Sequence, residues 1–225
     1  METLDPPIHT LVASCHFSRL VFSLPEAVAP LQTALQFELA EYDFRPENLH
    51  LAFSSARPTD WTLSLQFLWQ RAALRVWIGG FELTFWYPTW QDKEAISEML
   101  LRVERAVSTS LPRESLARRD LFLSGHFPAS EAELAAHGRR FASELPSGLG
   151  RPAFEGAVLR LRTEAFSEEA VVVFDRSAVL PSGIFVSIQC RFDSAEYDAR
   201  SSVTVFSVYA RTVLQTLDLE QRDAD

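Results

Sequence analysis

The chain has 225 residues, of which 47% are apolar and 23% charged, a composition that excludes a disordered, collagen-like or low-complexity protein. A net charge of −9, from 21 basic and 30 acidic residues, disfavours non-specific binding to nucleic acid or anionic membranes, whose phosphates attract basic groups. No apolar run reaches the ~20 residues that span a bilayer, the N-terminus lacks the basic residues of a targeting signal, and only two cysteines occur, so a cytoplasmic protein is expected.

The first half alternates between strand and helix patterns. Alternation over 11–23 predicts a strand or a pair of strands, and Leu24-Pro25-Glu26 opens a helix with an apolar stripe as far as Leu39. Asp92 is expected to cap a second helix, through Val107. Between the two helices the Gly79-Gly80 pair indicates a hairpin. Four strands are predicted there, over 49–53, 61–69, 72–78 and 81–87.

The second half repeats this order. Residues 121–127 predict a strand, and Ser130 with Glu133 forms a capping box at the start of a helix. A last helix is predicted over about 200–219, with Asp198 as its cap. The polar segment 111–120 is expected to be a linker between the halves. Three further strands are predicted near 154–163, 170–175 and 182–192.

Each half therefore reads β-α-β-β-β(-β)-α, and the opening strands share the pattern S-x-H-F at 14–17 and 124–127. This favours a duplicated unit, 1–112 and 113–225, packed as one pseudo-twofold structure. Hairpin-linked strands predict an α+β fold, with an antiparallel sheet covered by helices on one face. The order resembles the saddle fold of TATA-box-binding proteins and helix-grip domains. The resemblance concerns topology, since no sequence motif of either family is present, and it implies no function.

No common catalytic, nucleotide or metal motif occurs, so neither a cofactor nor a metal is expected. Cys15 and Cys190 are expected on the same face of their strands as the apolar residues, and therefore to be buried and unreactive. His16 and His126 could meet near the pseudo-twofold axis. They would serve there as polar residues of the open sheet face or, together with Arg191, as catalytic groups.

The candidate surface is the strand face that points away from the helices. Trp77 and Trp86 are expected on the face of their strands opposite to the apolar residues. Exposed aromatic side chains there indicate a partner or ligand, unless an oligomer or a loop buries them. Arginines on such a face are either solvated or readers of carboxylate or phosphate. We expect one aromatic, mixed end and one Arg-rich end. The expected ligand- or partner-binding residues are Trp77, Trp86, Arg75, His16, His126, Arg160, Arg162, Gln189 and Arg191.

Three functions remain open from the sequence. The first is a non-enzymatic binding protein that recognises a macromolecular partner on its open sheet face, such as an immunity or inhibitor protein against a basic effector. The second is a carrier or sensor of a small anionic or apolar ligand, held between the sheet and the last helix. The third is a hydrolase or nucleotide-handling enzyme. A homodimer is compatible with each, whereas the net charge disfavours nucleic acid as the partner.

Overall fold

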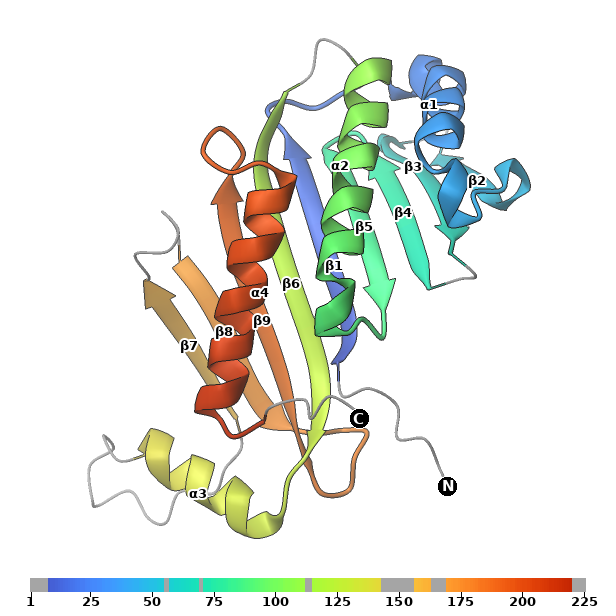
Figure 1. The fold of residues 1–225 in the computed structure, drawn as a ribbon. Coiled ribbons are helices and arrows are strands. Elements are labelled where there is room, and N and C mark those ends of the chain that lie inside the picture. The colour runs from blue at the N-terminus through green and yellow to red at the C-terminus, as the bar shows by residue number, and fades with distance from the viewer. Residues whose placement is uncertain are drawn as a thin grey trace.

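The computed structural model describes residues 8–54, 57–68, 71–111, 115–142, 156–162 and 169–219. In this part of the chain, antiparallel strands form one nine-stranded sheet with the order β2-β3-β4-β5-β1-β6-β9-β8-β7 (Figure 1). The strands are β1 (Ile8–Phe17), β2 (Leu49–Ser54), β3 (Arg57–Phe67), β4 (Ala72–Trp77), β5 (Gly80–Trp86), β6 (Leu116–Pro128), β7 (Ala157–Arg162), β8 (Glu169–Arg176) and β9 (Gly183–Asp193). The helices are α1 (Leu24–Glu38), α2 (Lys93–Ser110), α3 (Glu131–Ala142) and α4 (Ala199–Thr216), with short 3-10 turns η1 (Ala40–Tyr42), η2 (Pro46–Asn48) and η3 (Trp90–Asp92).

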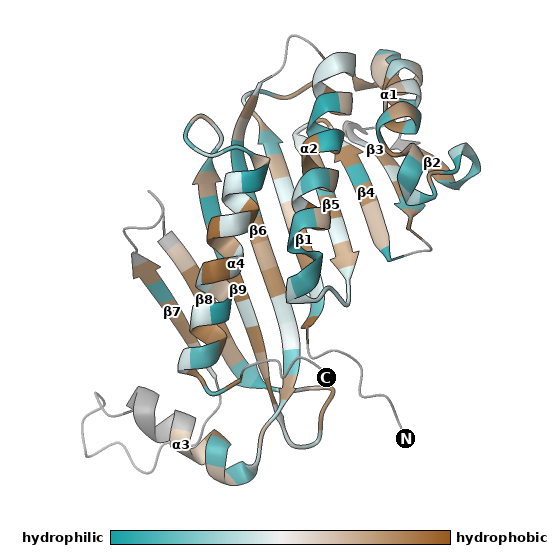
Figure 2. Ribbon diagram, in the orientation of Figure 1, coloured by the Kyte–Doolittle hydropathy of each residue, from teal (hydrophilic) through white to brown (hydrophobic). Residues whose placement is uncertain are grey.

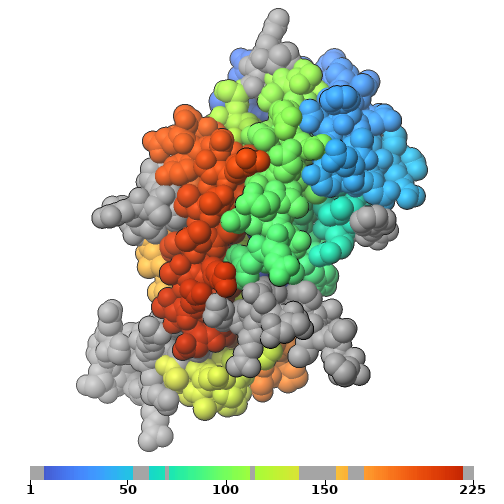
Figure 3. All heavy atoms as spheres, in the orientation of Figure 1, coloured from blue at the N-terminus to red at the C-terminus, as the bar shows by residue number. Residues whose placement is uncertain are grey.

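Three of the helices cover one face of the sheet. Helix α2 packs between α1 and α4 over the strands, and Figure 3 shows the three helices side by side. The expected α+β architecture, with helices on one face of an antiparallel sheet, is confirmed for α1, α2 and α4. Helix α3 departs from it, because it lies beyond the ends of the strands (Figure 1).

The pleat of the strands decides which side chains enter the core. Along β3, Leu63, Leu65 and Phe67 are buried, whereas the alternating Ser64 and Gln66 are not. The same alternation runs through β4, β5 and most of β1, because successive side chains point to opposite faces of a strand. The buried residues of both halves form one hydrophobic cluster beneath the helices, where the strands in Figure 2 are largely brown.

The two halves meet at the centre of the sheet, where β1 pairs with β6 in register Leu11↔Leu123 and Ala13↔Leu121. The expectation of a linker over 111–120 is wrong for its second part, because β6 begins at Leu116. Charged residues conceal this strand in the sequence. Arg119 and Asp120 are only 5% and 8% exposed, and ion pairs compensate their burial.

Two of the three predicted helix caps are confirmed. Ser130 and Glu133 form the capping box of α3, with the Ser130 backbone N–H donating to Glu133 at 2.6 Å. The Asp198 carboxylate accepts from the Ser201 N–H at 2.7 Å at the start of α4. The prediction for Asp92 is wrong. Asp92 instead accepts from the Thr89 N–H at 2.7 Å, so the capping box lies three residues earlier, around η3.

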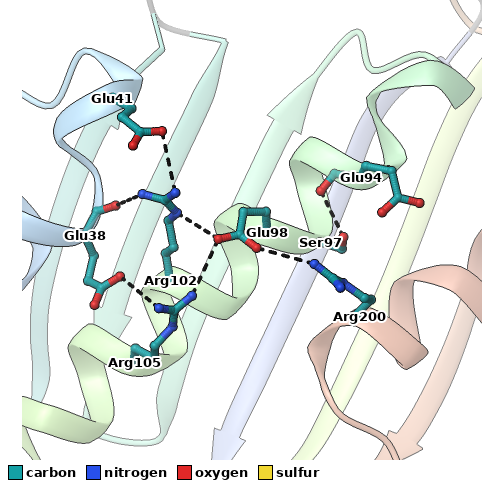
Figure 4. A network of polar contacts seen from close by, with 8 residues as sticks. All are labelled: Glu38, Glu41, Glu94, Ser97, Glu98, Arg102, Arg105 and Arg200. Carbon is teal, nitrogen blue, oxygen red and sulfur yellow. Dashed lines mark hydrogen bonds and ion pairs between the residues drawn. The ribbon is translucent and has the colours of Figure 1, made fainter.

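Salt bridges tie the outer sides of the helices together (Figure 4). Arg102 Nε donates to Glu98 Oε1 on the same helix at 3.0 Å, and this hydrogen bond raises the pKa of Arg102. Arg102 also donates to the Glu38 carbonyl at the end of α1, while Arg200 of α4 lies 3.6 Å from Glu98. The network therefore joins α1, α2 and α4. No helix among the described residues is both long and apolar enough to cross a bilayer.

Candidate functional site

The outer face, defined here as the sheet face opposite α1, α2 and α4, carries the candidate residues. In β1, β4, β5, β6 and β9 they alternate with buried residues, while Arg160 on β7 lies in register with Val171 and Gln189. No described helix lies on this face (Figure 1). The side chain of Arg162 lies outside the described residues. The candidates placed on the outer face are His16, Arg75, Trp77, Trp86, His126, Arg160, Gln189 and Arg191.

At one end of this face, three side chains surround the Asp120 carboxylate. His16 Nε2 and Arg118 Nε each lie 3.1 Å from Oδ2, and Arg191 Nε donates to Oδ1 at 3.1 Å. We call these four residues the Asp120 cluster. Burial and the nearby Arg118 charge lower the pKa of His16, whereas Asp120 opposes that shift. His16 is therefore largely uncharged at neutral pH.

An aromatic side chain and two facing residues of opposite charge flank the Asp120 cluster. The Trp77 ring meets His16 edge to face, with centroids 6.3 Å apart, and the Arg75 guanidinium lies 5.7 Å from the Trp77 centroid. Arg75 faces Glu82 across β4 and β5, and Ser14 donates to Glu82 at 3.1 Å. Charged side chains of both signs therefore lie in one row across the sheet, from Arg75 and Glu82 to Asp120 and Arg191.

At the opposite end of the outer face, four rings form a chain that we call the aromatic row. The His9 ring lies 5.5 Å from Tyr87 and 5.0 Å from His126, and the His126 ring lies 5.1 Å from Phe185. The Nδ1 atom of His126 is 2.8 Å from the Ser177 hydroxyl. Burial, and then the nearby His9, lower the pKa of His126. The row is a continuous surface of aromatic and imidazole rings, the kind of surface that is common at protein interfaces.

The structure separates residues that the sequence placed together. His16 pairs with Arg118 at the start of β6, whereas His126 lies near the end of β6 beside His9. The paired strands β1 and β6 form the seam between the two halves. Because they run antiparallel, the two histidines lie at opposite ends of this seam, and the expectation that they could meet is wrong. An active site that uses both of them is not supported by this geometry.

The candidates expected at the aromatic end lie on the first half of the sheet and those expected at the Arg-rich end on the second, but neither set forms one compact group. Trp77 lies beside the start of β5 and Trp86 at its end. Arg160 is on the edge strand β7, two strands from β9, which carries Arg191. The Asp120 cluster and the aromatic row each combine residues of both halves, because β1 and β6 join the halves.

Sequence reasoning missed Arg118, Asp120, His9 and Tyr87. Arg118 and Asp120 fall in the segment expected to be a linker, and His9 precedes the predicted start of the first strand. Only the register of β1 against β5 and β6 brings these residues to the candidates. To predict a strand over 116–120, one would have had to know that Arg119 and Asp120 pair with charged residues far away in the sequence.

A second polar cluster lies inside the core, on the helix side of the sheet. The Arg119 guanidinium donates to both carboxylate oxygens of Glu104, at 2.5 and 2.9 Å, and to the Tyr197 carbonyl. The Cys15 thiol is 3.8 Å from Glu104. Burial and the Glu104 charge raise the pKa of Cys15 well above its usual value, and burial raises that of Cys190 to about 12. Both cysteines are buried thiols, as predicted.

A pocket between α2, α4 and the sheet has space for only about one water molecule. Its lining includes Ile8, Trp90, Lys93 and Val203. This volume is far below that of sites that enclose small ligands. Within the described residues, no three His, Cys, Asp or Glu side chains are placed to hold a metal ion.

Comparison with known proteins places this chain in no family. No family model matches it, and neither does any curated protein. A solved structure described as Methanococcus jannaschii TBP aligns with 95% of this chain and 98% of that chain, at 15% sequence identity and a TM-score of 0.34.

Proposed function

We propose that this chain is a binding protein without catalytic activity, which docks a protein partner on the outer face of its sheet. The observation that carries the proposal is the asymmetry of the sheet: three helices cover one face, and no described helix covers the other. The outer face also carries the aromatic row and the Asp120 cluster. Half-buried aromatic rings and arginines are typical of the residues that dominate binding energy at interfaces.

The partner that fits best is a basic protein, such as an effector that this chain would inhibit in the cytoplasm. A net charge of −9 accelerates encounter with a basic surface. The outer face itself carries both signs, so contact there depends on matched pairs. Long-range attraction and specific docking would then be supplied by different parts of the molecule.

We also propose that the two halves, 1–112 and 113–225, arose by duplication. From the β1–β6 seam outward, the first half places β5, β4 and β3 in the positions that β9, β8 and β7 occupy in the second. Helix α2 is the last element of the first half, and α4 is the last described element of the second. The displaced helix α3 and the additional strand β2 are the differences that accumulated after such an event.

The test is purification of the tagged protein from its own host, followed by titration of each purified partner against variants. Phe185→Ala removes one ring of the aromatic row, and Trp77→Ala removes the ring beside the Asp120 cluster. We expect at least one of the two to weaken binding about tenfold or more. The matched control is Phe22→Ala, which removes a ring 62% exposed before α1 and should leave binding unchanged.

Two results would contradict the proposal. One is a partner that binds all three variants as tightly as the original chain, while circular dichroism shows that each variant is folded. The other is a partner that nuclease treatment releases, since this would identify nucleic acid as the bound molecule.

A further inference from the structure

Strand β2 forms one edge of the sheet, and among the described strands only β3 pairs with it. An edge strand presents backbone N–H and C=O groups that can pair with another strand. Proteins commonly block such edges with charged residues, proline or bulges. The chemistry of β2 therefore decides whether this edge is protected.

The β2 edge lacks the residues that usually protect an edge strand. Residues 48–56 (NLHLAFSSA) contain no acidic residue, Lys, Arg or Pro. Strand β7 at the other edge carries two arginines in six residues, Arg160 and Arg162. Leu51 pairs with the buried Leu63 and shares its helix-side parity, yet Leu51 is 42% exposed. Adding a strand beside β2 would extend the apolar layer of the sheet over this leucine.

We propose that β2 pairs antiparallel with β2 of a second copy of this chain. An antiparallel pair about a twofold axis is self-complementary and brings the same short segment together from both copies. It places no Asp, Glu, Lys or Arg side chain opposite another. Two chains that each carry −9 repel through most of their surface, so a contact free of like charges is the favourable place for self-association. The result is a continuous sheet through both copies.

The mass of the protein in solution tests this pairing. We expect sedimentation equilibrium at about 100 µM to give twice the chain mass of 25.4 kDa. Leu51→Lys places two ammonium groups near the twofold axis and should raise the dimer dissociation constant at least about tenfold. The matched control is Leu161→Lys on β7, where the leucine is 38% exposed, and this variant should remain dimeric.

Hydrogen exchange provides a second measurement that needs no variant. Amides of 49–54 should become protected as the concentration of the original chain rises, whereas amides of β7 should not. A monomer at the highest concentration overturns the proposal. So does a dimer that persists in Leu51→Lys, or one that Leu161→Lys also dissociates. Because Leu51 lies on the edge, away from the outer face, these outcomes are independent of the proposed partner docking.

Discussion

At the scale of single residues, the Arg119–Glu104 pair is the most consequential contact inside the core. Both residues are at most 9% exposed, and together with the Tyr197 carbonyl they connect β6, α2 and the segment before α4. Removing one partner leaves the other charge buried without compensation, which is far more costly than losing an exposed pair.

We predict that Glu104→Gln lowers the free energy of unfolding by about 3 kcal/mol, measured by urea denaturation. The double variant Glu104→Leu/Arg119→Met should recover much of this loss, because it removes both charges. The matched control is Glu98→Gln, in the network of Figure 4, which should cost less than about 1 kcal/mol. Equal losses for Glu104→Gln and Glu98→Gln would contradict this account of the buried pair.

His16 and His126, on the outer face, make stability depend on pH. Burial is the first cause that lowers the pKa of both His16 and His126 below 6.5. The unfolded chain therefore binds protons at a pH where the folded chain does not. The free energy of unfolding should fall as the pH drops from about 6.5 through the folded pKa values.

NMR titration of the imidazole signals checks the origin of this dependence. Both histidines should show midpoints below 6.5 in the folded protein. His126→Gln should reduce the slope of unfolding free energy against pH in that range. A midpoint above 6.5 for either histidine would contradict the dominance of burial.

At the scale of elements, α4 depends on its N-terminal cap. The Asp198 side chain accepts from the Ser201 N–H, and this hydrogen bond lowers the pKa of Asp198. Asp198→Ala should reduce the free energy of unfolding by about 1 kcal/mol, whereas Asp198→Ser should keep most of it. Glu196→Ala, at an exposed position two residues before the cap, serves as the control. Thermal unfolding that shows no difference between Asp198→Ala and this control would exclude a capping role.

The caps also show what local sequence can and cannot predict. Ser130 and Asp198 each lie directly before an apolar stripe, and a cap needs only neighbours within one turn. Asp92 satisfied the same rule. Its carboxylate instead accepts from the backbone N–H of Thr89, three residues earlier, so Asp92 is the N3 residue of a capping box. Elements defined by nearby residues were therefore predictable, with errors of a few residues at their ends.

Contacts that depend on distant pairing were not predictable in the same way. The strand faces of Trp77, Arg75 and Gln189 follow from alternation alone. The grouping of His16 with Asp120, or of His9 with His126, follows only from the register of β1 against β6. The charged start of β6 further concealed that register, because Arg119 is compensated by Glu104, a residue on a different element.

At the scale of the whole molecule, one hydrophobic cluster runs through both halves. Helices α2 and α4 pack together across the seam, so opening one half exposes the core of the other. We therefore expect one cooperative unfolding transition rather than two. The five tryptophans lie between positions 61 and 90, so their fluorescence reports on the first half.

The second half has its own probe in Cys190, which is buried. In a Cys15→Ala variant, thiol labelling of Cys190 should follow the same denaturant midpoint as tryptophan fluorescence. Separate midpoints would show that the halves unfold independently, and that the seam contributes less than the shared core indicates.

The seam also has a consequence for synthesis on the ribosome. Strand β1 is made first, but β6, its partner on one side, begins 99 residues after β1 ends at Phe17. At roughly 5–20 residues per second, translation takes roughly 5–20 s to cover that interval. During this time β1 can join β5, yet it remains the outermost strand of a nascent sheet and carries a low-charge, aggregation-prone edge. Pauses in translation before residue 128 would lengthen this exposure and increase the need for a chaperone.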